Sequence, residues 1–401
     1  MIRRLSVVLA VAFSYACGAA ETPTGPPPAP APSRADQAFM AVGYSCAFGT
    51  DDRRFSVHEI DLSTGAVRPA ALATGSSLWA GVIDFGPHRP NGRLVYVARY
   101  PAGGRGNETL QIQSLDATGT LHAVGEMTMP AGRAFYPGRI DSAGRYMVVA
   151  GRLVNAADYT KEDPQISLHL LDANGVPRAA SSTAAGLASV IDMVIAPNGR
   201  MVYAASTLSP PLAAYSVQPD TGTIQPIPGS PFAGSGRGSF TMAIHPSGRF
   251  LYTADYNNDR PNQVVWLHQI DGTTGEPRFA GGFRGDSAGY MAIEPSGRYL
   301  YLATWTGQIW AYTIDGGSGA LAPLPGYPIA AAWQAADSAT IDATGRYLYV
   351  TAQPSQGSRT PANTPIHAYR IDSATGTLSA VAGFPMNPST EACAAIAVAS
   401  R

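Results

Sequence analysis

Ten residues of types suited to binding or catalysis fall at two corresponding points of a pattern that recurs along this chain. Five stand where a short apolar segment begins, and five stand just after the next apolar segment ends. Aromatic rings beside arginines and carboxylates could bind a sugar, an aromatic acid or a peptide; alternatively, the rings fill space and the charges pair with one another. The first five are Tyr136, Asp192, Phe240, Tyr290 and Asp337, and the second five are Arg99, Arg152, Asp255, Tyr256 and Trp305.

Other groupings of reactive residues point less clearly to a site. Asp255, Asn257, Asn258 and Asp259 could offer oxygen ligands to Ca²⁺, but no Gly-containing calcium loop surrounds them, and an ordinary Asn/Asp-rich turn is the alternative. The histidines form no pair at metal-ligand spacing, and no serine lies in a Gly-x-Ser-x-Gly turn. We therefore expect neither a metal nor a cofactor, and the residues alone identify no catalytic group.

The pattern that positions these residues is a repeat. A Gly-Arg pair precedes a short apolar strand six times, at intervals of 48 to 55 residues, as in GRFLYTA and GRYLYLA. Strand patterning at a period near 50 residues predicts a β-propeller, in which each repeat forms one four-stranded blade. The six glycines are Gly92, Gly144, Gly199, Gly248, Gly297 and Gly345.

The chain ends decide the number of blades. Residues 38–48 align with a second strand that has no first strand before it, and the C-terminal ACAAIAVAS aligns with a first strand. Joined, they complete a seventh blade and leave no free sheet edge between the chain ends. We therefore expect 394–398 to pair with 38–44, and inner strands at 242–245, 291–294 and 339–342; a six-bladed ring with ragged ends is the alternative.

This architecture brings the two sets of candidate residues to one place. Loops that precede inner strands and loops that follow second strands share the mouth of the central channel, where propellers usually hold ligands. The ten residues named above are therefore expected around the channel mouth.

The N-terminus predicts export. Arg3 and Arg4 precede an apolar run that is too short to span a membrane, and Ala16–Cys17 resembles the cleavage box of bacterial lipoproteins. Lipidation at Cys17 would end a signal peptide at 1–17; cleavage after Ala20 is the alternative. Prolines in 18–37 favour an extended tether, so the propeller would occupy 38–401. We expect an extracytoplasmic protein, lipid-anchored to a bacterial membrane such as the outer membrane, or else secreted.

Composition limits the partners. Charged residues make up 14% of the chain and the net charge is −1, so there is no basic field for nucleic acid. We expect a monomer that contacts a membrane only through the lipid anchor.

The segment HPSGRFLYTADYNND at 245–259, with the aromatic-containing strand, the Ile-Asp pair and the Thr-Gly turn that follow, resembles a known repeat unit. It is similar to that of the lactonase-type seven-bladed propellers, the group of bacterial 6-phosphogluconolactonase and fungal muconate-lactonizing enzyme. The resemblance covers 38–401 and implies the same all-β, seven-bladed fold.

The resemblance does not extend to the catalytic residues of that family. There, an Arg-His pair and a further histidine would act on the lactone oxygens, while the carboxylate of an Asn-Glu pair serves as base. On this chain the Arg-His pair falls on Phe240 and Thr241, the Asn-Glu pair on Asp255 and Tyr256, and the further histidine on Ile191. The resemblance therefore implies the scaffold without its catalytic set.

Two functions from different classes follow. The favoured one is a surface-tethered module that binds a small molecule (a sugar, a lactone or an aromatic acid) or a protein at the channel mouth. The alternative is a divergent lactone hydrolase, a carboxylic ester hydrolase. Its substrate would be an unphosphorylated lactone, because the phosphorylated substrate of 6-phosphogluconolactonase is cytoplasmic.

The cysteines predict a covalent closure of the ring. With Cys17 in the leader, Cys46 and Cys393 remain as an even pair in an oxidising compartment. They lie at neighbouring strand ends of the shared blade, so we expect a Cys46–Cys393 disulfide; two free thiols one residue out of register are the alternative.

Overall fold

Short strands joined by turns rich in Gly, Pro, Asn and Asp build the chain, and no helix occurs among the residues described. No described segment is a helix long and apolar enough to cross a membrane. The computed structural model describes residues 37–44, 55–73, 79–89, 92–100, 109–116, 119–128, 133–153, 164–233, 238–255, 264–285, 289–331, 333–353, 365–386 and 394–400.

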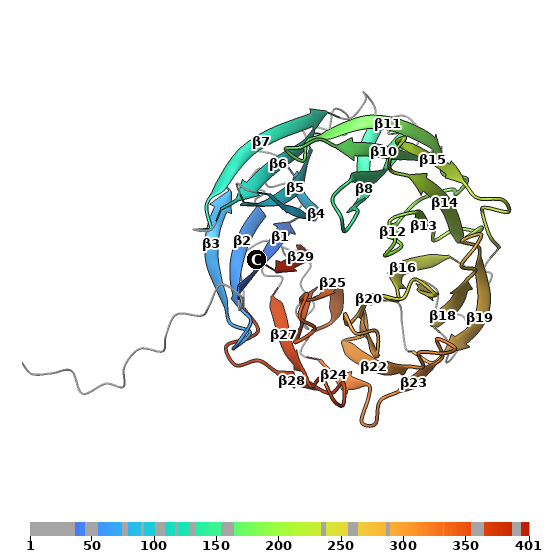
Figure 1. The fold of residues 1–401 in the computed structure, drawn as a ribbon. Coiled ribbons are helices and arrows are strands. Elements are labelled where there is room, and N and C mark those ends of the chain that lie inside the picture. Colours follow the sequence, from blue (N-terminus) through green and yellow to red (C-terminus); the bar gives the residue numbers. More distant parts are fainter. Residues whose placement is uncertain are drawn as a thin grey trace, which may run out of the picture.

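The strands form seven antiparallel sheets arranged as blades around a central axis (Figure 1). The inner strands are β29 (Ala394–Ser400), β4 (Trp79–Arg89), β8 (Arg133–Ile140), β12 (Asp192–Ile195), β16 (Ser239–Ile244), β20 (Gly289–Ile293) and β25 (Ala335–Ile341). The second strands are β1 (Gln37–Tyr44), β5 (Gly92–Tyr100), β9 (Tyr146–Leu153), β13 (Met201–Ala205), β17 (Phe250–Asp255), β21 (Tyr299–Thr304) and β26 (Tyr347–Gln353).

The third and outer strands complete the blades toward the rim. The third strands are β2 (Phe55–Asp61), β6 (Thr109–Leu115), β10 (Gln165–Leu171), β14 (Leu212–Gln218), β18 (Val265–Ile270), β22 (Gln308–Ile314) and β27 (Ile366–Ile371). The outer strands are β3 (Val67–Ala73), β7 (Leu121–Thr128), β11 (Pro177–Ala184), β15 (Thr223–Pro226), β19 (Pro277–Phe283), β23 (Leu321–Pro323) and β28 (Leu378–Ala380). One blade carries an additional short strand, β24 (Ile329–Ala330), which pairs with β22.

The two chain ends close the ring as predicted. Strand β29 pairs with β1 in a register that runs from Ala38↔Ser400 to Tyr44↔Ala394. The inner strands contact one another in sequence around the whole circle, from β29 through β4 to β25 and back to β29. The seven-bladed prediction is therefore confirmed and the six-bladed alternative is wrong. The predicted inner strands at 242–245, 291–294 and 339–342 correspond to β16, β20 and β25, each antiparallel to the strand that follows its Gly-Arg pair.

The Gly-Arg pairs recur because the turn between inner and second strands requires glycine. Gly297 has φ +78°, and a Cβ atom there would lie 2.3 Å from Nε2 of His245 in the preceding blade. That imidazole hydrogen-bonds to the Gly297 carbonyl at 2.9 Å and, through Nδ1, to the Ser247 hydroxyl at 2.7 Å. A side chain at position 297 would therefore strain the backbone and displace a contact between blades.

Tyrosines of the second strands latch four of the blades to the blade that follows. The hydroxyl of Tyr252 donates to the Gly319 carbonyl at 2.7 Å, and that of Tyr301 donates to the Gly376 carbonyl at 2.8 Å. In both cases the glycine lies in the turn between the third and outer strands of the following blade. The equivalent bonds are Tyr96 to Gly175 at 2.7 Å and Tyr203 to Gly275 at 3.0 Å.

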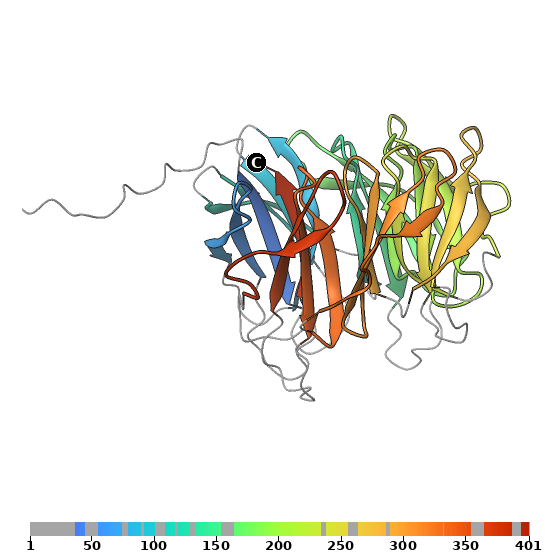
Figure 2. The same ribbon diagram turned by 90° about the horizontal axis from the view of Figure 1, so that it is seen from below.

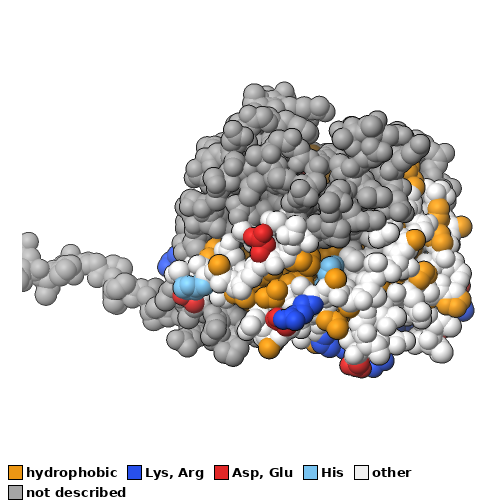
Figure 3. Space-filling model, turned by 90° about the horizontal axis from the view of Figure 1, so that it is seen from above, with side chains coloured by type: hydrophobic (Ala, Val, Ile, Leu, Met, Phe, Trp, Pro, Cys, Tyr) orange, Lys and Arg blue, Asp and Glu red, His pale blue; other side chains and the backbone are white. Residues whose placement is uncertain are grey.

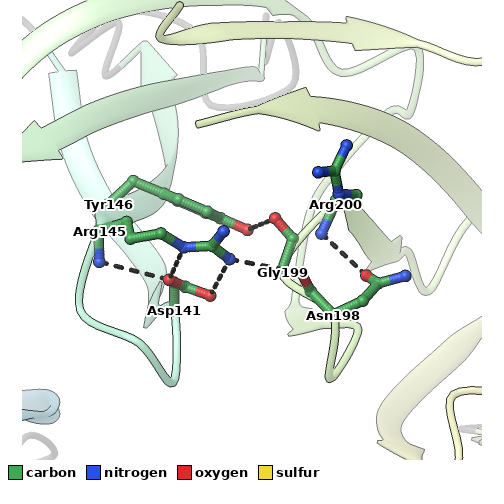
Figure 4. Close-up of polar contacts among 6 residues, drawn as sticks. All are labelled: Asp141, Arg145, Tyr146, Asn198, Gly199 and Arg200. Carbon is green, nitrogen blue, oxygen red and sulfur yellow. Dashed lines mark hydrogen bonds and ion pairs between the residues drawn. The ribbon is translucent and has the colours of Figure 1, made fainter. Parts of the chain in front are cut away.

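The second strand β9 has Val148 at this position, and its blade is latched near the first turn instead (Figure 4). Tyr146 donates to the Gly199 carbonyl at 2.9 Å, and Arg145 reaches the Asn198 carbonyl at 3.4 Å. Arg145 is held by Asp141 through Nε at 2.7 Å and Nη2 at 3.0 Å. The blades are therefore tied by specific hydrogen bonds as well as by apolar packing.

Removing one tyrosine hydroxyl should show how much such a hydrogen bond between blades contributes to stability. Tyr252→Phe leaves the buried phenyl ring in place but removes the donor to Gly319, which should destabilise the propeller by about 1–3 kcal/mol. The matched control is Tyr349→Phe, because the buried Tyr349 hydroxyl has no hydrogen-bond partner among the described residues. Thermal unfolding of both variants measures the difference. Equal losses of stability in the two variants would contradict the latch.

Strands of every blade run between the two faces of the ring, as the edge-on view in Figure 2 shows. Among the described residues visible on the rim in Figure 3, charged side chains are scattered among uncharged and hydrophobic ones. Arginines of the outer strands pair with nearby carboxylates, as Arg178 does with Asp172 at 3.3 Å and Arg278 with Glu276 at 3.0 Å.

Candidate functional site

The channel mouth is the end of the ring at which inner strands begin and second strands end. The register places Ser239 opposite Asp255, Gly289 opposite Thr304 and Asp192 opposite Ala205. The two predicted sets of residues therefore lie at the same end of their hairpins. Side-chain contacts show which of these residues come together.

Three aromatic side chains meet there and form what we call the aromatic cluster: Phe240, Tyr290 and Trp305. The Phe240 ring packs edge-on against Trp305 at a centroid distance of 4.6 Å and against Tyr290 at 5.5 Å. Phe240 comes from β16, whereas Tyr290 and the residue before Trp305 belong to β20 and β21 of the next blade. All three side chains are partly exposed. The cluster therefore joins two blades and presents ring surface at the mouth.

A backbone irregularity directs Phe240 into this position. The β16–β17 register shifts between Ser239 and Thr241, so Phe240 is the extra residue of a β-bulge. Bulges re-aim a side chain relative to regular alternation.

A second group of contacts centres on Asp192, at the start of β12. Its Oδ1 accepts from Nη2 of Arg139 at 2.6 Å and from the backbone N–H of Met193 at 2.8 Å. Its Oδ2 accepts from the backbone N–H of Met242 at 2.9 Å and from the Thr241 hydroxyl at 3.4 Å. One carboxylate thus binds groups from β8, β12 and β16. We call Asp192 with these partners the Asp192 hub.

The Asp192 carboxyl group lies in a poorly solvated environment. Burial raises the pKa of the Asp192 carboxyl, while Arg139 and the N–H groups of Met242 and Met193 act in the opposite direction. The side chain of Asp192 is 13% exposed and that of Arg139 is 36% exposed. The arginine is therefore the member of the ion pair that meets solvent.

The other two predicted acidic residues lie on a second strand, β17, and on an inner strand, β25. Asp255 ends β17 and is buried, and its backbone N–H donates to the Val264 carbonyl at 3.0 Å. Asp337 is partly buried on β25, at a register shift between Ala336 and Ser338.

The remaining predictions cannot be compared with side-chain positions. Tyr256 lies outside the described residues, as do Cys17, Cys46 and Cys393. The backbones of Arg99, Tyr136 and Arg152 belong to β5, β8 and β9, with Arg99 opposite Ala80 and Arg152 opposite Ala134, but the structure does not describe their side chains. Among the described residues, no group of three or more His, Cys, Asp or Glu side chains could hold a metal ion.

Sequence reasoning did not predict the two side chains that bind Asp192, those of Arg139 and Thr241. A signal for Arg139 was present: its repeat position, one before the isoleucine that ends the inner strand, is Val194, Ala243, Ala292 or Thr340 in other blades. A charged residue at a position that is otherwise small and uncharged indicates a specific partner.

Comparison with known proteins supports the fold. No protein-family model matches the sequence, and no curated protein matches it. Among solved structures, one provisionally assigned as a 6-phosphogluconolactonase of Bacteroides fragilis has a TM-score of 0.66 at 17% identity, covering 91% of this chain and 99% of that one. A similar assignment from Bacteroides uniformis gives 0.65 at 16%, covering 90% and 99%.

A third neighbour is described as a periplasmic gluconolactonase of Pseudomonas aeruginosa. Its TM-score is 0.66 at 15% identity, with coverage of 90% of this chain and 99% of that chain. The chain therefore has the fold of 6-phosphogluconolactonase-like seven-bladed propellers over nearly their whole length. Because one fold hosts many functions, this likeness does not fix the activity.

Proposed function

We propose that this chain is an extracytoplasmic binding protein that holds a small ring-shaped ligand, a sugar or a lactone, at the mouth of its channel. The aromatic cluster is the observation that carries this proposal. Phe240, Tyr290 and Trp305 leave ring surface exposed at a point where two blades meet, although most large apolar side chains of the described chain are buried. Ligand sites typically combine such ring surfaces with a few fixed polar groups, which the Asp192 hub and Asp255 provide here.

The location forms part of the proposal. Residues 1–20 have the features of an export signal, and a neighbour of the same fold is described as periplasmic. A lipid on Cys17 would tether the propeller to the membrane through the Pro-rich segment. The mass of the mature N-terminus distinguishes lipidated Cys17 from a chain cleaved after Ala20.

Calorimetric titration of the mature protein with glucose, galactose and glucono-1,5-lactone tests the binding role. We expect saturable binding to at least one probe. Trp305→Ala and Phe240→Ala should each weaken it about tenfold or more, because a ring contact is removed. The matched control is Phe279→Ala, since Phe279 is 53% exposed on the outer strand β19, away from the channel. Binding to none of the probes, or equal effects of all three variants, would overturn the proposal.

A lactone hydrolase is the second candidate, and the gluconolactonase neighbour favours it. Water would add to the lactone carbonyl, the ring C–O bond would break, and a hydroxy acid would result. Asp255 is the carboxylate that ends the second strand β17. If glucono-1,5-lactone is hydrolysed saturably above its spontaneous rate, and if Asp255→Asn abolishes this in a folded protein, the hydrolase replaces the binding role.

A further inference from the structure

Arg139 occupies an unusual position for a charged residue. It lies on the inner strand β8, opposite Val148, and β8 borders the channel in Figure 1. It is the one basic side chain that the structure describes on an inner strand. About a third of that side chain is exposed, on a strand that belongs to the inner ring of the propeller.

Two hydrogen bonds fix the position of the Arg139 guanidinium. Nη2 donates to Asp192 at 2.6 Å, and Nη1 donates to the carbonyl of Gly138 at 2.9 Å. Asp192 cannot swing away easily, because its oxygens also accept from Met193, Met242 and Thr241. Both ends of the ion pair are therefore held in one arrangement before any ligand arrives.

The two partners differ in their spare hydrogen-bonding capacity. A carboxylate has about four acceptor sites, and Asp192 uses them on four donors. A guanidinium has five N–H donors in a rigid fork, and these bonds use two of them. The spare donors belong to the arginine, in the geometry that suits a second carboxylate.

We propose that Arg139 binds the carboxylate of an acidic ligand, so that the channel selects a ring-bearing acid, such as a sugar acid or an aromatic acid, over its neutral analogue. This inference rests on the proposed binding function and names the ligand class. The hub links the guanidinium to the strand that carries Phe240: Nη2 lies 2.6 Å from Asp192 Oδ1, and Asp192 Oδ2 lies 2.9 Å from the backbone nitrogen of Met242, two residues after Phe240. A ring and its carboxylate could therefore meet Phe240 and Arg139 at the same time.

The test compares matched pairs of probes: glucuronate with glucose, and benzoate with benzyl alcohol. The wild-type protein should bind the acid of at least one pair about tenfold more tightly than its neutral partner, with the difference shrinking as salt rises. Arg139→Gln should abolish this preference, because it should weaken binding of the acid about tenfold more than binding of its neutral partner. The control is Arg178→Gln, because Arg178 is a rim arginine whose side chain is 76% exposed.

Arg139→Gln leaves the buried Asp192 without its cation, so the variant could fail to fold. Arg139→Gln combined with Asp192→Asn removes both charges and keeps the preference measurable. Persistence of the acid preference in either folded variant overturns the inference, as does equal wild-type affinity for acid and neutral probes. If neutral probes bind through Phe240 without any acid preference, only this inference fails. If nothing binds, the proposed function fails with it.

Discussion

Acidification from pH 6.5 to pH 4 should destabilise this propeller by several kcal/mol, because four buried histidines must remain neutral in the folded chain. Burial lowers the pKa of His58, His169, His268 and His367 to about 4, from an ordinary value of 6.5. Below pH 6.5 these histidines bind protons in the unfolded chain but remain neutral in the folded chain, so the free energy of unfolding decreases as pH falls. Stability is therefore highest above pH 6.5 and is progressively lost toward pH 4.

The size of this effect follows from the shifts. At about 1.4 kcal/mol per pKa unit, each histidine could contribute up to roughly 3 kcal/mol at pH 4. Even half of that value, taken over four sites, is comparable with the whole stability of a typical domain, about 5–15 kcal/mol. We therefore expect the propeller to unfold in mild acid rather than only at strongly acidic pH.

Thermal midpoints measured between pH 8 and pH 4 check this prediction. Replacing His169 and His268 together by Gln should flatten the profile, because Gln does not titrate. His122→Gln is the matched control: His122 is 55% exposed and lies 2.8 Å from Asp116. A wild-type thermal midpoint that stays constant from pH 7 to pH 4.5 would contradict the prediction.

The shared position of three of these histidines could not be predicted from the sequence repeat. In the sequence, the histidines form no pair at metal-ligand spacing. In the structure, His58, His169 and His268 occupy one repeat position, at the register shift between the third and outer strands. A bulge cannot be recognised from hydrophobic alternation alone, so their common role became visible only with the pairing.

The fold could be predicted because the strands of each repeat form hydrogen bonds with one another, and each repeat packs only on its neighbours. The Gly-Arg spacing predicted six blades, and the alignment of both chain ends predicted the seventh, in which β29 pairs with β1. The candidate site could be predicted only as far as strand ends, which brought Phe240, Tyr290 and Trp305 to one place. The Arg139–Asp192 contact joins two different blades and residues 53 positions apart, so no local pattern contains it.

A disulfide between Cys46 and Cys393 should close the ring covalently. Both cysteines lie outside the described residues, but the strands that lead to them are paired up to Tyr44↔Ala394. Opposite residues of an antiparallel pair have Cα atoms about 4.5–5.5 Å apart, which is within the range that a disulfide bridges. Cys46 comes two residues after Tyr44, and Cys393 immediately precedes Ala394, so both start from a suitable separation.

The register decides between the two alternatives that the sequence left open. If regular pairing continued beyond Tyr44↔Ala394, Cys46 would oppose Ala392, and the two cysteines would point to opposite faces of the blade as free thiols. A disulfide therefore requires that regular pairing ends at this pair, with Ser45 as an extra residue. Register shifts also interrupt other inner-strand pairs, as in β8–β9, β16–β17 and β25–β26, although there the extra residues lie on the inner strand.

The expected stabilisation is large because the bond would close a loop of nearly the whole propeller. In the chain-entropy model this contributes roughly 5 kcal/mol, less any strain in the folded state. Peptide mapping without reductant, on protein from the bacterial envelope, should recover the peptides of Cys46 and Cys393 linked. Cys46→Ser, Cys393→Ser and the double variant should then lower the thermal midpoint equally, and reductant should lower only that of the wild type. Free thiols at both positions would refute the disulfide and favour regular pairing beyond Tyr44, with the ring closed by strand hydrogen bonds alone.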